Sequence, residues 1–377
     1  MTDQSNPNPS ALPLNYRERD TEYVFRLLFA GESCSLVGVG SVGKSNLLQL
    51  LVDERVKRQY LGDYAPYMLM VLLDPHKIVH LQERALQQAG TAWPGYEIML
   101  SRLRRTVTEL EDRGLLPAAA SEEEHLSKQV EELYLNLFQD QALLVQSGIR
   151  HLEEVIFEIM RLGPYWKIAF LFDEFEAFAN LPAEFFESLR GVRDEFKNRI
   201  VFLTTSRRPL RQLVDEPKQK KMEGFLELID GSVRYLGPLD RDSADAMLRR
   251  LEERYQRVLE PANRRNLLDA TSKHPGLMRK SFPYMQDLAT GTITMELLCD
   301  HLLQFQGVRQ ECETILDSLS LDECQCLWDI AQGLYNGCGP EVERALKAKE
   351  LMNLSYAGAP TVSLPLLRRY LQGQPRP

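Results

Sequence analysis

The chain has 377 residues, of which 44% are hydrophobic and 26% are charged, and its formal net charge is -9. This length suffices for two or three domains with a large core, and the composition is that of a globular protein. The acidic balance gives no global electrostatic reason to expect nucleic acid or an anionic membrane as a partner, and no apolar run approaches the ~20 residues that span a bilayer.

The N-terminus is polar and rich in proline, without the basic and apolar stretches of a signal peptide. We expect residues 1–15 to be disordered and the protein to be cytoplasmic. The cysteines agree with this, because they form no C-x-x-C set. Buried thiols explain Cys324, Cys326 and Cys338 better than a metal site that includes His301.

Residues 16–30 carry apolar side chains at helical spacing and predict a helix that leads into the first strand, residues 34–37. A glycine-rich turn follows, with Gly38, Gly43, Lys44 and Ser45 in the G-x-x-x-x-G-K-[ST] pattern of a P-loop. A chance match is disfavoured because a strand precedes the turn and helical periodicity follows it. The loop predicts ATP or ADP binding.

Each residue type suits that chemistry. Backbone N–H groups must wrap a triphosphate closely, which requires residues without Cβ and favours a following helix N-terminus. Lys44 would neutralise the β- and γ-phosphates, and Ser45 would supply an oxygen ligand to Mg²⁺. The nucleotide-binding set is expected to be Gly38, Gly40, Ser41, Val42, Gly43, Lys44, Ser45 and Asn46.

A second buried strand is expected at residues 67–74, followed by a helical insert over about residues 90–163, with helices at 96–113, 122–146 and 149–162. The third strand ends in Asp173 and Glu174, the form of a Walker B segment. Asp173 would hold the Mg²⁺ shell, and Glu174 would orient and deprotonate the attacking water. Glu176 is expected to face solvent, and the alternative is a further carboxylate that supports the metal ligands from behind.

The fourth strand, residues 199–208, ends in polar residues followed by Arg207, where a sensor of the γ-phosphate would lie. Thr205 belongs to the same expected nucleotide site. The alternative for Arg207 is a solvated loop arginine. Residues 232–236 predict a fifth strand.

Beyond residue 239 the pattern predicts helices only, at 243–258, 261–270, 274–290, 294–305 and 309–319, typical of a lid beside a nucleotide. Residues 320–377 predict two helices, short strands and a last helix, which suggests a winged helix. Its basic residues are balanced by acidic ones, so DNA is possible but not favoured.

In this order the motifs resemble the STAND class of signalling P-loop ATPases, relatives of AAA+ and origin-recognition ATPases. The resemblance rests on the P-loop, the Asp173-Glu174 pair, Thr205-Ser206-Arg207, and the helical lid with its winged helix. It implies an α/β P-loop NTPase fold, a parallel sheet flanked by helices over residues 16–239, a helical lid over 240–319 and a winged helix over 320–377.

One element departs from the family pattern. The lid of the family usually carries Gly-x-Pro, whereas this chain has Lys273-His274-Pro275, so the proline remains and a lysine replaces the glycine. By resemblance Pro275 would contact the base, and the lysine changes the expected lid geometry. A simple helix start is the alternative explanation, because proline is favoured in the first turn of a helix.

These motifs predict a slow regulatory ATPase, a switch whose nucleotide state controls the lid, the winged helix, and association with a partner or with further copies of the chain. Glu174, Lys44 and Arg207 would be the catalytic residues, and ATP/ADP and Mg²⁺ the cofactors. The alternative is a DNA-associated AAA+ ATPase of replication or transposition. A small-molecule kinase is a third reading, but no acceptor pocket is visible in the sequence.

Overall fold

The computed structural model describes residues 12–76, 92–116, 125–136, 144–285, 293–355 and 358–375. The chain divides into two compact units. Unit 1 comprises Met1–Asp20, Val37–Leu47 and Tyr235–Pro377, and unit 2 comprises Thr21–Leu36 and Leu48–Arg234. The segment predicted to be disordered lies outside the described residues up to position 11. Beyond it, the Tyr16 N–H donates to the Pro13 carbonyl at 3.0 Å and closes a turn.

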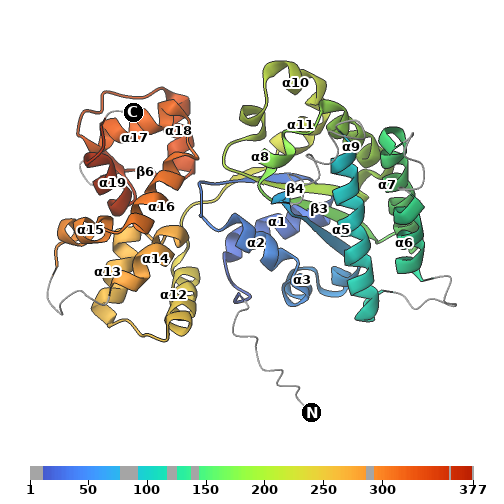
Figure 1. The fold of residues 1–377 in the computed structure, drawn as a ribbon, viewed down its shortest axis with the longest axis horizontal. Helices are drawn as coiled ribbons and strands as arrows, with labels where there is room; N and C mark the ends of the chain where they lie inside the picture. Colours follow the sequence, from blue (N-terminus) through green and yellow to red (C-terminus); the bar gives the residue numbers. More distant parts are fainter. Residues whose placement is uncertain are drawn as a thin grey trace, which may run out of the picture. The chain divides into compact units, whose positions relative to one another are not determined.

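A five-stranded sheet in the order β2-β3-β4-β1-β5 forms the centre of unit 2 (Figure 1). Neighbouring strands β2, β3 and β4 pair in parallel. The strands are β1 (Cys34–Val37), β2 (Met68–Leu73), β3 (Lys167–Phe172), β4 (Ile200–Ser206) and β5 (Val233–Tyr235). All five predicted strands are present, and the prediction of a parallel sheet flanked by helices is confirmed.

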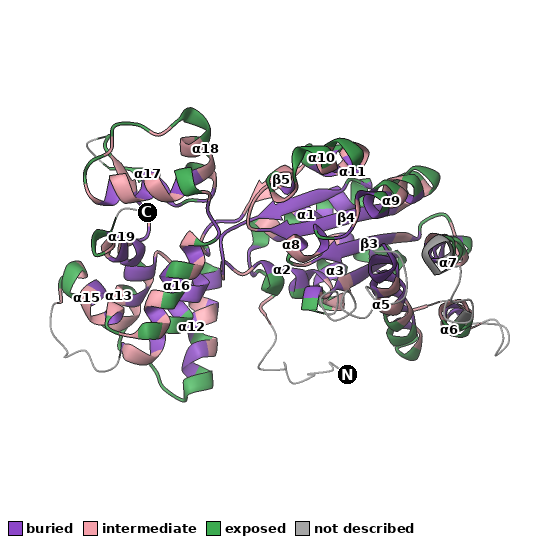
Figure 2. Cartoon of the chain, turned by 45° about the horizontal axis from the view of Figure 1, so that its top comes forward, coloured by how far each residue is buried: buried purple, intermediate pink, exposed green. Residues whose placement is uncertain are grey.

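Both faces of the sheet are covered, as the apolar runs without alternation require. Val71, Phe170 and Phe202 face a core that is shared with several helices, and the intervening residues Ala169 and Val201 are also fully buried. Figure 2 shows the strands β3 and β4 as buried along their length. The sheet is therefore a rigid base for the loops at its ends.

The helices that lie wholly or mainly in unit 2 include three in the predicted insert. They are α1 (Glu18–Ala30), α3 (Glu54–Leu61), α5 (Trp93–Asp112), α6 (Leu126–Asn136), α7 (Leu144–Arg161), α8 (Phe175–Phe178), α9 (Ala183–Phe196), α10 (Glu216–Lys221) and α11 (Glu223–Asp230), with short 3-10 helices η1 (Gly62–Tyr67), η3 (Lys197–Arg199) and η4 (Leu210–Leu213). In the insert, α5 packs on β2 and on both α6 and α7. The predicted break between helices at 122–146 and 149–162 is wrong, because α7 runs without interruption from Leu144 to Arg161; residues 117–124 and 137–143 lie outside the described part.

In the described residues from 241 onward, unit 1 contains helices and one antiparallel pair of strands. Its elements are α12 (Arg241–Tyr255), α13 (Pro261–Thr271), α14 (Pro275–Ser281), η5 (Phe282–Tyr284), α15 (Met295–Leu303), α16 (Gln306–Leu316), α17 (Leu321–Ala331), α18 (Pro340–Ala348), β6 (Met352–Leu354), β7 (Pro360–Val362) and α19 (Pro365–Gln372). The helix predicted over 274–290 ends at Ser281, where Pro283 follows in a 3-10 turn and cannot donate a helical hydrogen bond. The antiparallel pair β6 and β7 follows two helices, in the predicted order.

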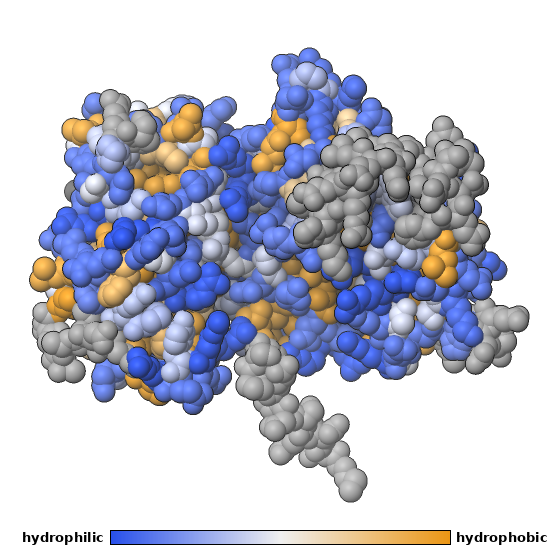
Figure 3. All heavy atoms as spheres, viewed as in Figure 1, coloured by the Kyte–Doolittle hydropathy of each residue, from blue (hydrophilic) through white to orange (hydrophobic). Residues whose placement is uncertain are grey.

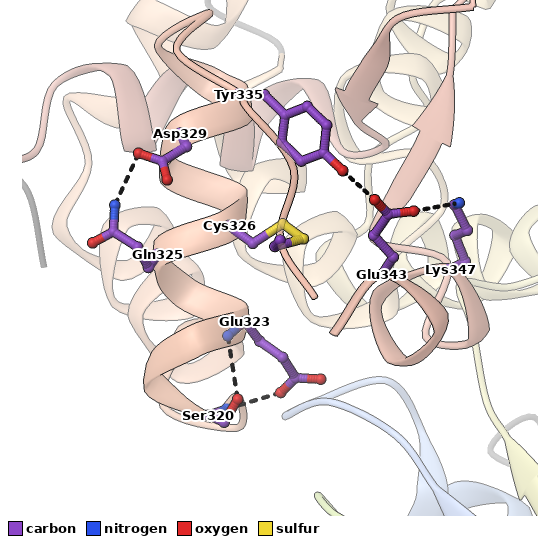
Figure 4. Close-up of a disulfide and its surroundings, with 9 residues drawn as sticks. Ser320, Glu323, Gln325, Cys326, Asp329, Tyr335, Glu343 and Lys347 are labelled. Atoms are coloured by element: carbon purple, nitrogen blue, oxygen red, sulfur yellow. Dashed lines mark hydrogen bonds and ion pairs between the residues drawn. A yellow bond between two sulfur atoms is a disulfide. The ribbon is translucent and has the colours of Figure 1, made fainter. Parts of the chain in front are cut away.

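A disulfide joins Cys326 of α17 to Cys338 in the segment before α18, with 5.8 Å between the Cα atoms (Figure 4). The expectation of buried thiols is therefore wrong for Cys326 and Cys338. At the other end of α17, Ser320 and Glu323 form a capping box, and the Glu323 carboxylate also accepts from the buried Lys349 ammonium at 2.6 Å. These bonds fasten α17 to both ends of α18.

The surface in view in Figure 3 is mainly hydrophilic, with separate hydrophobic patches between polar side chains. Among the described residues, no helix has the length and apolar character needed to cross a membrane.

Two helical glycines give opposite expectations for an added methyl group. A Cβ on Gly95 of α5 would lie 2.4 Å from the buried Phe185 ring of α9, whereas a Cβ on Gly191 of α9 would meet nothing within 4 Å. We expect Gly95→Ala to lower the free energy of unfolding by about 1–3 kcal/mol through overpacking. Gly191→Ala should raise it by up to about 1 kcal/mol through helix propensity. Urea unfolding of both variants measures this, and a stabilised Gly95→Ala would contradict the packing of α5 on α9.

Candidate functional site

The glycine-rich loop between β1 and α2 (Lys44–Leu51) passes through two left-handed residues, Ser41 with a φ of 54° and Gly43 with a φ of 101°. Such residues, separated by one of ordinary conformation, turn successive N–H groups toward one side and form an anion-binding nest. Gly38 allows the loop to close, because a Cβ there would lie 2.8 Å from the Val42 side chain. The loop thus has the backbone conformation that accepts phosphate groups.

Lys44 lies within this loop with 8% of its surface exposed. Its ammonium donates to the Gly38 carbonyl at 2.7 Å and to the Val39 carbonyl at 3.0 Å. The next two residues, Ser45 and Asn46, are exposed in the first turn of α2. The loop therefore holds its cation over the nest and leaves a hydroxyl at the helix N-terminus open to a ligand.

The turn before α1 closes one side of the loop. Arg17 is 3% exposed, and its guanidinium donates to the Val42 carbonyl at 2.6 Å and to the Gly237 carbonyl at 2.8 Å. The Tyr16 hydroxyl lies 3.1 Å from the position that a Cβ on Gly43 would take. Nothing in the sequence marked Arg17 as part of this site. Its φ of 49° excludes it from α1, which begins at Glu18, two residues later than predicted.

The start of α14 reaches the same loop through Pro275, whose Cγ lies 3.8 Å from the position of a Cβ on Gly43. Between α13 and α14 the chain turns through Ser272 with a φ of 45° and Lys273 with a φ of 64°. Lys273 therefore adopts the left-handed conformation that a glycine adopts more readily. The lysine at this position therefore still permits the turn between α13 and α14.

His274 caps α14 and is buried beside the loop. Its Nδ1 accepts the Leu277 N–H at 3.4 Å, and only 1% of its surface is exposed. Burial, together with the positive charges of Arg17 and Lys44, lowers the pKa of the imidazole to about 3, against the opposite effect of the Gly40 carbonyl. The imidazole is therefore neutral at physiological pH and adds no third positive charge to the phosphate loop.

A further helix also lies on the loop. The hydroxyl of Ser318, just beyond α16, accepts the Gly40 N–H at 2.7 Å. Glu311, within α16, is 4% exposed and lies against Gly276 of α14. No local pattern distinguishes Ser318 or Glu311 in the sequence, and both were missed.

Unit 2 brings together three of the predicted residues. The Thr205 hydroxyl donates to Asp173 Oδ1 at 2.7 Å, and the Glu174 N–H is directed at both side chains, 3.0 Å from Asp173 Oδ1 and 3.1 Å from Thr205 Oγ1. Thr205 thus orients the carboxylate of Asp173. Among the described residues no hydrogen bond is formed by Asp173 Oδ2, so this oxygen can accept from water.

Glu174 has an exposed side chain and a left-handed backbone, with a φ of 44° and a ψ of 62°. Phe175 and Phe178 of the following helix are buried in an aromatic cluster, with the rings of Phe172 and Phe178 4.8 Å apart. Because the residues on both sides of Glu174 are held in the core, the chain keeps this unfavourable conformation at the end of β3.

Glu176 is half-buried, so the expectation that it faces solvent is wrong. Its Oε1 accepts the Arg207 N–H at 2.5 Å and thereby holds the backbone at the end of β4. The Arg207 side chain is itself half-buried. Both possibilities for its guanidinium, sensor or solvated arginine, remain predictions.

The predicted residues therefore fall into two groups, one in each unit. Unit 1 holds the P-loop residues and Pro275, and unit 2 holds Asp173, Glu174, Thr205 and Arg207.

Each of the two groups contains donors of a kind that a magnesium nucleotide takes. The nest and Lys44 suit phosphate, and the Ser45 hydroxyl and Asp173 carboxylate are oxygen donors of the kind that Mg²⁺ takes. The described residues contain no cluster of three or more metal-ligating His, Cys, Asp or Glu side chains. Mg²⁺ needs none, because in nucleotide sites it binds one or two protein oxygens together with phosphates.

The sheet order, the phosphate loop after β1 and the carboxylate pair after β3 define the fold of a P-loop NTPase. Among solved structures the chain is similar to the Walker-type ATPase PABY2304 of Pyrococcus abyssi, with a TM-score of 0.54 and 14% sequence identity. The match covers 94% of this chain and 95% of that one. At this identity the likeness shows a shared fold, and it extends over nearly the whole chain.

Two other structures match with lower TM-scores. Domain III of the Thermotoga maritima replication initiation protein DnaA has a TM-score of 0.38 and 12% identity, over 80% of this chain and 98% of that one. The ORC1 protein of Aeropyrum pernix, in complex with DNA, has a TM-score of 0.36 and 12% identity, over 98% and 96%. No protein-family model and no curated protein sequence matches the chain.

The low pKa of His274 predicts a pH dependence of stability. An unfolded chain takes up a proton near pH 6.5, whereas the folded chain does so only near pH 3. This contribution to stability is therefore complete above pH 6.5 and is lost as the pH falls. Between pH 6.5 and about pH 5 the resulting fall in the free energy of unfolding should amount to about 2 kcal/mol.

His274→Asn keeps an acceptor for the Leu277 N–H but does not titrate. The unfolding free energy of this variant should fall less between the two pH values than that of the wild type. The matched control is His76→Asn, which changes an exposed histidine and should keep the wild-type difference. Equal pH dependence in all three proteins would contradict a buried neutral His274.

Proposed function

We propose that the chain is an ATP-binding switch, a STAND-like AAA+ ATPase that hydrolyses ATP slowly and whose nucleotide state sets the arrangement of its C-terminal helices. The observation that carries the proposal is the closure of the phosphate loop by distant segments of unit 1. Gly40 contacts Ser318, and Gly43 has Tyr16 and Pro275 as neighbours. A loop with these neighbours cannot exchange its ligand without affecting the helices that touch it.

In this proposal Lys44 and the nest bind the phosphates, and Pro275 and Tyr16 lie beside them where they can cover the nucleoside. Ser45 and Asp173 hold Mg²⁺, which when bound neutralises phosphate charge during cleavage. Glu174 orients the attacking water and accepts its proton. Arg207 reads the terminal phosphate. Nucleotide shifts the conformational balance only by its different affinity for the two arrangements.

The output is then a rearrangement of the lid and of α17 to α19, which we assign to a winged helix. The rearranged chain would bind a protein partner, an effector or further copies of itself. Binding of DNA is not favoured, because two cations in and directly after α18 are occupied: Lys347 pairs with Glu343 at 3.0 Å, and Lys349, just beyond the helix, is buried against Glu323. A DNA-reading helix needs such cations free on one face.

Lys44→Ala should abolish nucleotide binding, because the nest would lose the cation that neutralises the phosphates. We expect the affinity for ATP and for ADP to fall by about 100-fold or more, because about two charge-assisted contacts between Lys44 and the phosphates are lost. Calorimetric titration measures the loss. Lys220→Ala, which removes an exposed lysine of α10, should bind as the wild type does. Unchanged ATP affinity in Lys44→Ala would remove the P-loop from the proposal.

Glu174→Gln should bind ATP normally but fail to hydrolyse it, because the amide cannot accept the proton of the attacking water. Turnover should fall by about 10²- to 10⁴-fold, the usual contribution of a general base. Phosphate release under saturating ATP gives the rate. The control is Glu187→Gln, an exposed position of α9, which should keep wild-type turnover.

The trapped Glu174→Gln protein also tests the switch itself. We expect its mass or hydrodynamic radius in ATP to differ from that of the wild type in ADP. Wild-type turnover in Glu174→Gln would exclude this glutamate as the base, and identical dimensions in both nucleotides would contradict the switch.

A further inference from the structure

The end of α16 lies directly on the phosphate loop of unit 1. The Ser318 hydroxyl accepts the Gly40 N–H at 2.7 Å and donates to the Thr314 carbonyl at 2.8 Å, so both of its hydrogen-bonding roles are used. A Cβ on Gly40 would lie 2.6 Å from the Thr314 methyl group and 2.7 Å from its carbonyl oxygen. Gly40 is therefore in close contact with this helix, and its N–H is not available to another acceptor.

About two turns before Ser318, α16 places a carboxylate beside the same loop. Glu311 is 4% exposed, and its Oε1 is buried without a hydrogen-bond partner among the described residues. A Cβ on Gly276 would lie 2.0 Å from this oxygen and 2.6 Å from the Ser41 Cβ, which places the carboxylate next to Ser41 of the loop. A buried unpaired carboxylate oxygen is costly, so a role outside simple packing has to explain it.

The position of the Lys44 ammonium indicates which phosphate of a nucleotide would lie at the Gly40 end of the loop. In P-loops the lysine reaches the β- and γ-phosphates, while the helix N-terminus takes the phosphates nearer the nucleoside. The Lys44 ammonium lies on the carbonyls of Gly38 and Val39, at the start of the loop and next to Gly40. Gly40 and Ser41 therefore lie at the end of the site where a third phosphate enters.

We propose that Ser318 and Glu311 make this arrangement of unit 1 selective for a nucleoside diphosphate over a triphosphate; the inference rests on the proposed function. A third phosphate needs the Gly40 N–H that Ser318 holds, and its negative charge approaches the carboxylate of Glu311. A diphosphate disturbs neither contact. ATP binding must therefore displace the end of α16, and ADP binding leaves it in place, which gives the two nucleotides different affinities for the two arrangements.

The test compares the affinities of ADP and of a non-hydrolysable ATP analogue, both with Mg²⁺, by calorimetry on the full chain. Glu311→Gln removes the charge at constant shape, and Ser318→Ala frees the Gly40 N–H. We expect the ratio of the analogue Kd to the ADP Kd to fall by about tenfold in Glu311→Gln. The reason is that one partly screened repulsion, between the Glu311 carboxylate and the third phosphate, is removed. In Ser318→Ala the ratio should fall by about threefold, the effect of one neutral hydrogen bond.

Asp317→Asn is the matched control, because it removes one negative charge from an exposed position next to Ser318 and should leave the ratio unchanged. A ratio that stays constant in both Glu311→Gln and Ser318→Ala, while the wild type binds both nucleotides, overturns this selectivity but leaves the ATPase proposal standing. A wild type that binds neither nucleotide overturns both. If one variant does not fold, the ratio in the other decides.

Discussion

The buried guanidinium of Arg17 holds the phosphate-binding part of unit 1 together. The guanidinium donates to the Val42 carbonyl of the P-loop and to the Gly237 carbonyl, and it forms an ion pair with Asp20 at 3.2 Å. The backbone N–H of Arg17 donates to the Ser243 hydroxyl at 2.8 Å. A cation removed from water needs partners of this kind, and they must stay in place because an unpaired buried charge is costly. The N-terminal turn, the loop and the start of α12 therefore keep one arrangement, which fixes the shape of the nest.

Much of the fold could be predicted from the sequence because its signals are local. The strands β1 to β4 are short, mainly apolar and largely buried, and β1 is found at its predicted bounds. The P-loop and the carboxylates after β3 are contiguous motifs whose flanking elements support them. Their chemistry is a prediction from residue type and spacing. The boundaries that failed lie where apolar periodicity does not mark the end of a helix, as before Pro283, which ends α14, and at residues 147–148, which lie inside α7.

The rest of the candidate site could not be predicted, because packing alone brings its residues together. Arg17 reaches Gly237 over 220 positions, and Gly40 reaches Ser318 over 278. Neither contact leaves a periodic or spaced pattern. His274 and Glu311 likewise become informative only when their burial is known. The Cys326–Cys338 pairing has the same origin, since proximity across a loop and not a motif spacing selects the partners.

Glu174 has a consequence for the balance between stability and activity. A glycine or an asparagine would adopt its left-handed backbone at lower cost, by about 1 kcal/mol for the relief of one such residue. The chain thus carries a less stable residue at the end of β3, held there by the phenylalanines that follow it. A search for thermostable variants would favour replacement at this position, and the same replacement would remove the carboxylate assigned to water activation. Under the proposed function, selection for stability alone would therefore favour a chain that binds ATP but no longer hydrolyses it.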